Sequence, residues 1–391
     1  VLYRLKDANH IAYLVGGSVR DLLLGRRPKD FDIGTSAHPY QVKRLFRNCW
    51  IIGRRFRLAH VKFGTKIIEV ATFRRQVPAT PDEAGEAAVD GGQRDLLIHR
   101  DNTFGTPEED AFRRDFTVNA LFYDIATLSI IDYVGGLQDL RDRVVRSIGD
   151  PEQRFLEDPV RMLRAIALAA RLDFSIDAPV ADAIRHHGSE IARSAPARLL
   201  EEYYKILRSG ASERTFRRLG EVGLLASMTP ELQRAPPALW QSLAALDGYR
   251  RRFGPTPERL TNAILLGSLL VPLGLPARRF HARGGARQPD RLMLGLLLMP
   301  RRELERLRQI LAMQPRLLDA TASPRAAWSL MNRTAFSEAL TWLEIHGHAP
   351  RAVDDWRALQ QERDRQRPEY VRAPFHPRRR HRRHRRAVQP Q

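Results

Sequence analysis

The stretch LVGGSVRDLLLGRRPKDFDIGT, residues 14–35, decides the fold of the first part of the chain. The apolar run at 11–15 predicts a strand, the pair Gly16-Gly17 predicts a turn, and the apolar spacing of VRDLLLG predicts a helix. FDIGT then alternates as a second strand. A strand, a turn, a helix and a strand in so short a stretch predict that the chain starts with mixed α and β structure.

Two aspartates, Asp30 and Asp32, lie one residue apart in the second of these strands. Side chains at i and i+2 of a strand point to the same face, with Cα atoms roughly 6.5–7 Å apart, and we expect Phe31 and Ile33 to point into a core. Two carboxylates on one face repel each other unless a cation lies between them. Mg²⁺ is the usual such cation when phosphates supply its remaining ligands, although a D-x-D pattern alone is more typical of solvated strand aspartates.

The glycine turn offers what a metal-bound phosphate needs. Between a strand and a helix, free backbone N–H groups and the helix dipole favour an anion. Gly17 lets the backbone approach closely, Ser18 can donate a hydroxyl hydrogen bond, and Arg20 adds positive charge. Together with Asp30 and Asp32, the turn predicts a nucleoside-triphosphate site in which one part holds the phosphates and the other holds the metals.

Strand signals continue to about residue 150. WIIG predicts a strand, and HVKFGTKIIEVATF predicts a hairpin with Gly64 in its turn. A helix is expected around 108–123 and a short strand at SIIDYV, whereas 76–100 lacks periodicity and is interpreted as a mobile insertion. Helical spacing then recurs at 154–172, 178–192, 197–208, 258–270, 301–313 and 335–346. The predicted fold class is α+β, with a mixed-sheet head followed by an all-helical body.

The charge balance points to a polyanionic partner. Lys and Arg total 65 against 45 Asp and Glu, a net charge of +20, and such a chain concentrates nucleic acid, although a genome rich in arginine codons would explain part of the excess. The segment HPRRRHRRHRR, 376–386, has no acid and nothing apolar to bury, so we expect a disordered tail that captures RNA backbone. An inert solubilising tail is the alternative. The arginines concerned are Arg378, Arg379, Arg380, Arg382, Arg383, Arg385 and Arg386.

The single cysteine, Cys49, excludes a disulfide framework within one chain and fits a reducing cytoplasm. No uninterrupted apolar run is long enough to span a bilayer. We therefore expect a cytoplasmic protein with no membrane span. Because the sequence starts at Val1 without methionine, targeting information in any upstream residues stays open.

With these motifs in place, the stretch 14–35 resembles the head motif of the class II nucleotidyltransferases of the polymerase-β superfamily. That family includes the CCA-adding tRNA nucleotidyltransferases and the bacterial poly(A) polymerases. Four more blocks follow in the family's order, so that the resemblance covers about residues 3–210. They are RRDFTVNALFYD at 113–124, DYVGGLQDLRDRVVR at 132–146, EDPVRMLRAI at 157–166 and ARLLEEYYKIL at 197–207.

The resemblance implies an organisation in four parts. A polymerase-β-like nucleotidyltransferase (palm/head) domain is expected at 1–150 and a helical neck that selects the nucleotide base at 151–215. A helical body that binds RNA is expected at 216–370, and the disordered arginine-rich tail at 371–391.

The resemblance also implies roles for single residues. Asp30 and Asp32 correspond to the metal-binding pair, Asp115 to a third active-site acid, and Arg114 to a nucleotide contact beside a more structural Arg113. The expected triphosphate contacts are Gly17, Ser18 and Arg20. From spacing alone, Glu69 in IIEVATF is a further candidate beside the two aspartates, or else a solvated or salt-bridged strand acid.

The block EDPVRMLR places Asp158, Arg161 and Arg164 at three-residue spacing, which predicts one helical face. A carboxylate and a guanidinium offer acceptors and donors in a fixed plane, so together they can read a base edge without a template. In similar enzymes this helix selects the incoming nucleotide, and an i, i+3 surface salt bridge is the alternative. Ala167 stands where the family usually has a further arginine, so we expect base selection to depend more on Arg161 and Arg164.

The segment GRRFRLAHV, 53–61, resembles a signature of the bacterial poly(A) polymerases. Its arginines, Arg54, Arg55 and Arg57, would face the primer or triphosphate, or else solvate a hairpin. The arginine tail also favours this branch, since a tailing enzyme must hold diverse single strands by their backbone. No C-terminal His/Asp signature of the phosphohydrolase type, found in some CCA-adding enzymes, is present.

The function that the resemblance implies is template-independent, two-metal transfer of AMP from ATP to RNA 3′ ends. Mg²⁺ is the expected cofactor, ATP the substrate, RNA 3′ ends the partner, and the RNA-decay machinery a further candidate partner. A CCA-adding tRNA nucleotidyltransferase and a non-catalytic RNA-binding adaptor remain the two alternatives.

Overall fold

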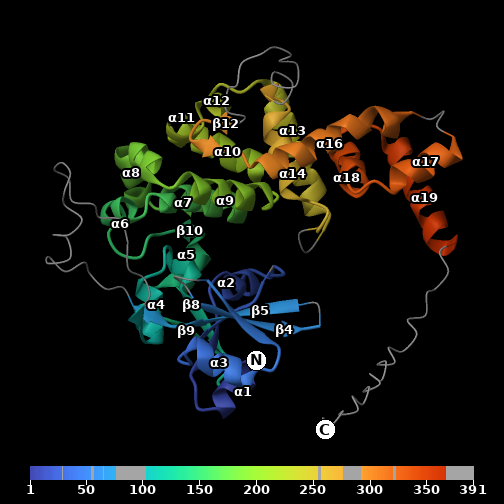
Figure 1. Ribbon diagram of the computed structural model, residues 1–391. Helices are drawn as coiled ribbons and strands as arrows, with labels where there is room; N and C mark the ends of the chain where they lie inside the picture. Colours follow the sequence, from blue (N-terminus) through green and yellow to red (C-terminus); the bar gives the residue numbers. More distant parts are fainter. Residues whose placement is uncertain are drawn as a thin grey trace, which may run out of the picture.

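The computed structural model describes residues 1–28, 30–53, 57–64, 66–75, 103–253, 257–275, 292–319 and 323–366. A head of mixed sheet and helices lies below a helical neck, and the remaining helices extend to one side (Figure 1). The predicted α+β class is confirmed. The predicted insertion at 76–100, two of the signature arginines, Arg54 and Arg55, and the arginine-rich tail lie outside the described residues.

The head is built on a seven-stranded sheet of order β3-β4-β5-β2-β1-β8-β9. β2 and β5 pair in parallel, and the other neighbours in this sheet pair antiparallel. The predicted hairpin is confirmed, because β4 and β5 flank Gly64, whose φ of 58° suits a glycine turn. The strands are β1 (Ala12–Val15), β2 (Asp32–Thr35), β3 (Cys49–Ile52), β4 (Leu58–Phe63), β5 (Lys66–Thr72), β8 (Leu121–Asp124) and β9 (Ser129–Asp132).

Three short helices pack on the sheet of the head. α1 (Leu2–Asp7) and α3 (Pro39–Leu45) pack on one face, over a core that includes Ile33, Val61 and Val70. α2 (Gly17–Leu23) packs on β1 and β8. The expectation that Phe31 points into a core is wrong: its side chain is 44% exposed, because β2 begins only at Asp32 and the strand alternation does not reach Phe31.

The helix expected around 108–123 is also corrected. α4 (Pro107–Phe112) starts at a Thr106 capping box and ends at Arg113, a 3₁₀ turn follows at Thr117–Asn119, and the chain then enters β8. The residues of β8 pair with β1 and β9, so sheet pairing overrides their helical spacing. This early end of α4 brings the chain at 113–119 to the edge of a cleft.

The helix predicted at 154–172, at the start of the neck, is two helices in the structure. α6 (Pro151–Glu157) ends before Pro159, which cannot continue its hydrogen bonding, and α7 (Val160–Leu172) follows. Short strands also occur beyond residue 150, contrary to the expectation that strands stop at about that position. They are β11 (Ser175–Ile176), paired with β10 (Val144–Val145), and β12 (Met293–Leu294), paired with β13 (Leu297–Leu298).

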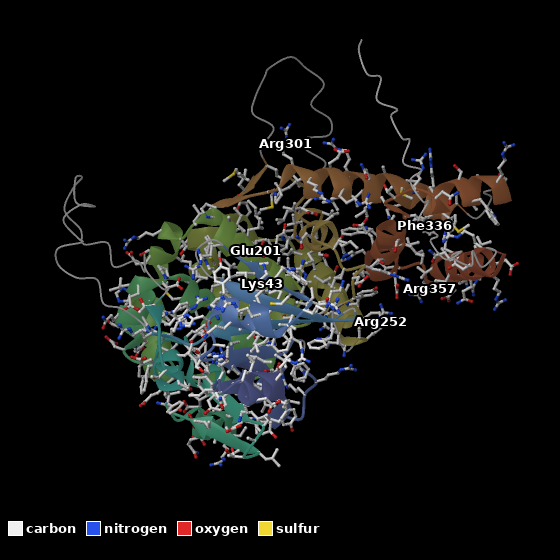
Figure 2. The ribbon with its side chains drawn as sticks, turned by 60° about the horizontal axis from the view of Figure 1, so that its bottom comes forward. Lys43, Glu201, Arg252, Arg301, Phe336 and Arg357 are labelled. Carbon is white, nitrogen blue, oxygen red and sulfur yellow. The ribbon has the colours of Figure 1, made fainter. Side chains whose placement is uncertain are left out.

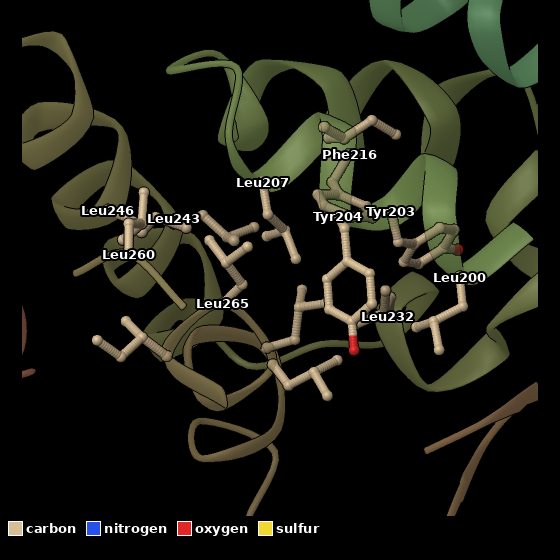
Figure 3. Close-up of a cluster of buried hydrophobic side chains, with 14 of the residues drawn as sticks. Leu200, Tyr203, Tyr204, Leu207, Phe216, Leu232, Leu243, Leu246, Leu260 and Leu265 are labelled. Atoms are coloured by element: carbon tan, nitrogen blue, oxygen red, sulfur yellow. The ribbon is translucent and has the colours of Figure 1, made fainter. Parts of the chain in front are cut away.

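The helical body packs around a continuous apolar core. Tyr203 and Leu207 of α9 meet Phe216 of α10 and Leu243 of α13 in this cluster (Figure 3). The remaining elements are β6 (Arg74–Arg75), β7 (Thr103–Phe104), α5 (Gly136–Asp142), α8 (Ala178–His187), a 3₁₀ turn at Gly188–Arg193, α9 (Pro196–Leu207), α10 (Ser212–Glu221), α11 (Leu224–Met228), α12 (Pro230–Gln233), α13 (Pro237–Arg251), α14 (Asn262–Leu270), α16 (Arg301–Leu318), α17 (Pro324–Met331), α18 (Phe336–His346) and α19 (Pro350–Gln366).

Charged contacts tie the outer helices of the body together. Arg252, just after α13, and Arg357 of α19 lie on the same side of the body in Figure 2, and both pair with Glu344 of α18, at 3.0 Å and 2.6 Å. No helix in the described part of the chain has the length and apolar character needed to cross a bilayer.

Candidate active site

A cleft of about 1400 Å³ lies between the head and the neck. Its walls carry fifteen Lys or Arg and seven Asp or Glu side chains. This surplus of positive charge concentrates a polyanion in the cleft. The predicted site residues that line it are Gly17, Ser18, Arg20, Asp30, Asp32, Arg114, Asp115, Asp158, Arg161 and Arg164. Two further candidates, Glu69 and Arg57, do not line it.

The glycine pair makes room for two guanidinium groups. Gly16 has φ +71°, and a Cβ added there would lie 2.9 Å from Nη1 of Arg114. A Cβ added at Gly17 would lie 3.2 Å from Nη2 of Arg20. The missing side chains therefore bring two arginines against the N-terminus of α2, where backbone N–H groups already favour an anion.

Two of the predicted phosphate contacts are engaged within the protein. The buried Ser18 hydroxyl donates to the Val15 carbonyl, 3.0 Å away. The buried Arg20 guanidinium donates to Asp21 Oδ1 at 2.6 and 2.9 Å and to the side chain of Asn119. Arg20 thus lies in the cleft wall with its charge partly balanced, and it links the turn to the chain around Asp115.

Asp30 and Asp32 lie on the head wall of the cleft. Asp30 is exposed just before β2, and Asp32 is half-buried as the first residue of that strand. In the sheet, Asp32 is in register with Val15 of β1 and with Glu69 of β5. Because register partners point to the same face, Glu69 lies on the same face as Asp32, as its spacing predicted. Glu69 Oε1 lies 3.4 Å from His60 Nε2 and the residue does not line the cleft, which favours the alternative of a solvated or salt-bridged strand acid.

The two aspartates provide part of a metal shell. Within the described ranges there is no cluster of three or more His, Cys, Asp and Glu side chains able to hold a metal by itself. A hard cation such as Mg²⁺ usually takes one or two carboxylates and completes its octahedron with water and substrate phosphates. The carboxyl pair beside the α2 N-terminus fits that pattern, since phosphate oxygens held at the turn would supply further ligands.

The cleft residue Asp115 is held by Arg164 of α7 in the neck. Its Oδ2 lies 2.6 Å from Nη2 of Arg164, and its Oδ1 accepts from the Phe116 N–H and the Asn119 amide at 2.9 and 3.0 Å. Burial alone would raise the pKa of this carboxyl, but Arg164 and the Asn119 hydrogen bond outweigh burial and lower it. Asp115 is therefore ionised at neutral pH, and it ties the head to α7.

The neck wall presents a buried acid next to a buried arginine. Asp158 lies in the break between α6 and α7, which corrects the expectation of a single helical face, yet it still faces the cleft with Arg161. Asp158 Oδ2 lies 2.6 Å from Arg198 Nη2 and 3.9 Å from Arg161 Nε. Burial lowers the pKa of Arg161 to about 10, with the neighbouring charge of Arg154 adding to the shift.

Two polar atoms of Asp158 and Arg161 lack hydrogen bonds within the described part of the chain. Asp158 Oδ1 and Arg161 Nη1 are buried and make no hydrogen bond to any described residue. Arg161 Nη1 lies 3.8 Å from Glu157 Oε2, an ion pair without a hydrogen bond. Buried polar atoms that lack hydrogen bonds cost stability, about 1–3 kcal/mol each. Side by side at a cleft, they are what a planar ligand edge with one donor and one acceptor would satisfy.

Arg113 and Arg114 share one carboxylate. Arg113 Nε donates to Asp110 Oδ1 at 3.1 Å, and Arg114 Nη2 donates to Asp110 Oδ2 at 2.8 Å. Burial raises the pKa of Asp110, but the two arginines outweigh burial and lower it. Arg113 thus has the structural ion pair that the sequence suggested, and Arg114 has one too while it faces Gly16 across the cleft wall.

Three family descriptions match the chain in order. They are "Poly A polymerase head domain" at residues 12–146, "Probable RNA and SrmB- binding site of polymerase A" at 173–235, and "Polymerase A arginine-rich C-terminus" at 293–389. The chain is 40% identical over 361 residues to poly(A) polymerase I of Salmonella typhimurium, which covers 88% of this chain and 77% of that protein. It is 50% identical over 234 residues to poly(A) polymerase I of Escherichia coli, covering 60% of this chain and 50% of that protein.

The chain belongs to the bacterial poly(A) polymerase I family. It is therefore a nucleotidyltransferase of the polyadenylating branch, and the prediction made from the motifs is confirmed. A crystal structure of the Bacillus stearothermophilus CCA-adding enzyme in complex with CTP shares the fold, with a TM-score of 0.62, 26% identity, and 92% of this chain and 80% of that chain covered. CCA addition thus marks a related family, and the adaptor reading is not supported because the family is enzymatic.

One residue of this poly(A) polymerase family member was missed from the sequence. Arg154 of α6 is buried, and its Nη2 donates to the backbone carbonyls of Arg113 and Arg114 at 2.9 and 2.6 Å. It thereby fixes the backbone directly before Asp115. The available signal was an arginine four residues before Asp158, but its role depends on a contact with a segment 40 residues away.

Arg171 supplies positive charge near Ala167. Ala167 lines the cleft without a charge, but Arg171 lies one helical turn further along α7 and also lines the cleft. Arg171 Nη1 is 3.9 Å from Asp21 Oδ2, and burial lowers the pKa of its guanidinium to about 10. Positive charge is therefore present on this face of α7 one turn beyond Ala167.

Proposed function

We propose that the cleft between head and neck transfers AMP from ATP to the 3′-hydroxyl of RNA, without a template, through the residues described above. The observation that carries this proposal is the meeting of three features in one cleft: the carboxyl pair Asp30 and Asp32, the glycine turn at the start of α2, and the unsatisfied atoms of Asp158 and Arg161. The three features correspond to the metal, triphosphate and base parts of a nucleotide.

The triphosphate is assigned to the head wall. Backbone N–H groups of Gly17 and Ser18 at the α2 N-terminus would donate to phosphate oxygens, with Arg20 and Arg114 adding positive charge beside them. Two Mg²⁺ ions held by Asp30 and Asp32 would supply activation of the attacking hydroxyl and neutralisation of the leaving pyrophosphate. The chain's own contribution is to fix the phosphates beside these carboxylates and to balance their charge.

The base is assigned to the neck wall. Asp158 Oδ1 would accept from the exocyclic amino group of adenine, and Arg161 Nη1 would donate to a neighbouring ring nitrogen. Guanine and uracil present a carbonyl acceptor where adenine has its amino group, and that acceptor would face the Asp158 carboxylate. This pair therefore favours adenine and cytosine, and it does not by itself separate ATP from CTP.

Asp115 is assigned an electrostatic role. Its lowered pKa makes it a weak proton acceptor at neutral pH. Its ion pair with Arg164 instead sets the position of α7 against the head. We propose that it holds the nucleotide-reading helix at the correct distance from Asp30 and Asp32, and stays ionised as the nucleotide binds.

The other parts of the chain are assigned to RNA. The family match over 173–235 and the basic neck residues that line the cleft support an RNA path along the neck and body, within the proposed ranges 151–215 and 216–370. The match over 293–389 supports the arginine tail at 371–391 as a capture segment. Docking of RNA-decay factors and a cytoplasmic location stay predictions. Deleting 376–391 should weaken primer binding and flatten its salt dependence.

A tail-extension assay tests the proposal. Wild-type protein, radiolabelled ATP, an oligo(A) primer and Mg²⁺ should give long adenylate tracts, and GTP or UTP should give little incorporation. Incorporation of CTP into tRNA that lacks its 3′ end, in place of long tracts, would assign the cleft to CCA addition. RNA binding without any incorporation would contradict the enzymatic assignment of these residues.

A further inference from the structure

A row of side chains leads away from the catalytic face of the sheet. Asp32 of β2 is in register with Glu69 of β5, Glu69 with His60 of β4, and His60 with Trp50 of the edge strand β3. Register partners point to the same face, so these four side chains form one line. Three strand spacings of about 4.8 Å make that line roughly 14 Å long.

Beyond Asp32, the sheet face with this row carries exposed side chains on β3, β4 and β5, although His60 itself is only 14% exposed. α3 packs against β3, β4 and β5 from the other side, over Ala59, Val61 and Val70. On the open side, Trp50 is 39% exposed, Ile67 is 48% exposed, and Glu69 is half-exposed. This face therefore offers an aromatic and an aliphatic side chain to a ligand.

The chemistry of this face suits a single-stranded nucleic acid. Trp50 packs against the edge of the His60 ring, with ring centroids 5.9 Å apart, which orients the indole. Exposed Lys62, in register with Ile67, adds a positive charge on the same face. Aromatic side chains that stack bases beside cations that meet phosphates are the usual means of binding single strands without sequence preference.

The position of this face decides which ligand it takes. The nucleotide assigned above extends from the α2 N-terminus to the neck, so the RNA 3′-hydroxyl must reach Asp30 and Asp32 from another direction. The open face of β5, β4 and β3 is continuous with Asp32 through the register row. The last nucleotides of an RNA primer would therefore lie along it.

We propose that the open face of β3, β4 and β5 is the platform for the 3′-terminal nucleotides of the RNA primer, with a base stacked on Trp50 and a phosphate beside Lys62. The inference rests on the proposed function, because it takes Asp30 and Asp32 as the point that the 3′-hydroxyl must reach. It assigns the part of the poly(A) polymerase signature that ends in His60 and Val61 to the primer rather than to ATP.

The first test compares Trp50→Ala with Trp50→Phe and with the control Trp328→Ala, which removes a similarly exposed tryptophan (41%) from α17. Loss of one stacked base should raise the KM for a short oligo(A) primer about tenfold, with the KM for ATP unchanged. Trp50→Phe should keep most of the affinity, since a phenyl ring also stacks. Equal primer KM values for Trp50→Ala and Trp328→Ala would overturn the inference.

A second test does not depend on the stability of a variant. A primer with 4-thiouridine next to its 3′ end, irradiated on the wild-type protein, should crosslink to the peptide that carries residues 49–63. Crosslinks confined to the helical body would overturn the inference. Lys62→Gln should also lower the slope of log Kd against log salt by about 0.7 for single-stranded RNA, and an unchanged slope would count against the phosphate contact.

The outcomes separate this inference from the proposed function. A wild-type protein that incorporates no AMP contradicts the proposed function. A wild-type protein that extends primers while Trp50→Ala behaves like Trp328→Ala contradicts the platform alone. A change confined to the oligomeric state of Trp50→Ala, measured by sedimentation, would assign the face to a second copy of the chain and overturn the platform.

Discussion

On the head wall of the cleft, Asp30 is exposed and Asp32 half-buried, whereas on the neck wall Asp158 and Arg161 are only 8% and 7% exposed. Exposed carboxylates keep their charge at little cost, and they can exchange water for a cation. The neck pair is charged within a low-dielectric wall and needs partners. It has Arg198 and Glu157 beside it, yet two of its polar atoms stay without a hydrogen bond to the described residues.

This difference in exposure suggests that the head wall carries the reaction and the neck wall recognises the nucleotide. A wall of solvated acids tolerates many ligands, because water and ions adapt to them. A wall with a fixed, buried donor and acceptor penalises every ligand that leaves them unpaired. We therefore expect substitutions on the head wall to abolish the reaction, and substitutions on the neck wall to change which nucleotide is used.

The largest expected effect comes from the head wall. Asp32→Asn removes a carboxylate charge that the proposed Mg²⁺ site needs, so kcat should fall by about three orders of magnitude or more. The melting temperature and the Kd for RNA should stay near wild-type values, because Asp32 lies at the cleft surface. The assay is primer extension, with Asp354→Asn on α19 as an exposed control. Activity within tenfold of wild type would remove Asp32 from the metal site.

The contact that couples the two walls should give the next largest effect. Arg154→Met leaves the carbonyls of Arg113 and Arg114 without their donor, and the backbone before Asp115 should shift. A displacement of about 1 Å in an active site costs on the order of a hundredfold in rate, so kcat should fall by about that factor with little change in the KM for ATP.

Two variants check that Arg154 acts by position. Arg154→Lys should recover part of kcat, because an ammonium can still donate to one carbonyl. Arg185→Met, on the exposed face of α8, should leave kcat unchanged. An Arg154→Met enzyme whose melting temperature falls while its kcat at a permissive temperature stays normal would reduce Arg154 to a purely structural residue.

The next largest effect is expected on the selectivity for the nucleotide base. Asp158→Asn replaces a carboxylate oxygen that only accepts with an amide that can also donate, so a carbonyl at the amino position of the base is no longer opposed. The preference for ATP over GTP in kcat/KM should fall about tenfold, in line with roughly 1–3 kcal/mol for one base-reading contact. Competition assays with both nucleotides measure it. An unchanged ratio would show that base selection lies elsewhere in the neck.

Much of the head wall could be predicted because its parts are close in sequence. The turn at Gly16-Gly17 and Asp32 lie within one strand–helix–strand unit, and local periodicity was enough to place them. Asp30, in contrast, precedes β2 and does not lie on the strand predicted for it. The predicted burial of Phe31 was wrong, because β2 starts one residue later, at Asp32, and local periodicity does not fix a strand boundary to one residue. The prediction of a helix through 108–123 was wrong because β8 is hydrogen-bonded to β1 and β9. A local sequence pattern carries no information on this pairing between distant strands.

The neck wall was harder to predict because its chemistry is tertiary. The motif gave the identities of Asp158, Arg161 and Arg164, but not the helix break at Pro159 or the pairing of Arg164 with Asp115. The sequence analysis did not identify Arg154, because its partners are backbone carbonyls, and these carry no sequence signal. The same holds for the register that aligns Trp50 with Asp32 across four strands.

The smallest effect is expected in acid stability. The pKa of Asp115 is lowered in the folded state from its usual value of 3.8. The ionised group therefore stabilises the fold fully above that value, and its contribution is lost as pH falls through the lowered pKa. Asp115→Asn should cost about 1–2 kcal/mol at pH 7, less than a fully buried pair would, because Arg164 is 40% exposed.

This gap in unfolding free energy between wild type and Asp115→Asn should narrow as the pH falls below about 4. Below that pH the unfolded wild-type chain takes up a proton at Asp115, whereas the folded chain keeps the carboxyl ionised to a lower pH. Urea unfolding at several pH values measures the gap, and Asp354→Asn serves as the control with a small gap at every pH. A gap that stays constant down to pH 3 would mean that Arg164 does not stabilise the ionised carboxylate, and the head would then be coupled to α7 mainly through Arg154.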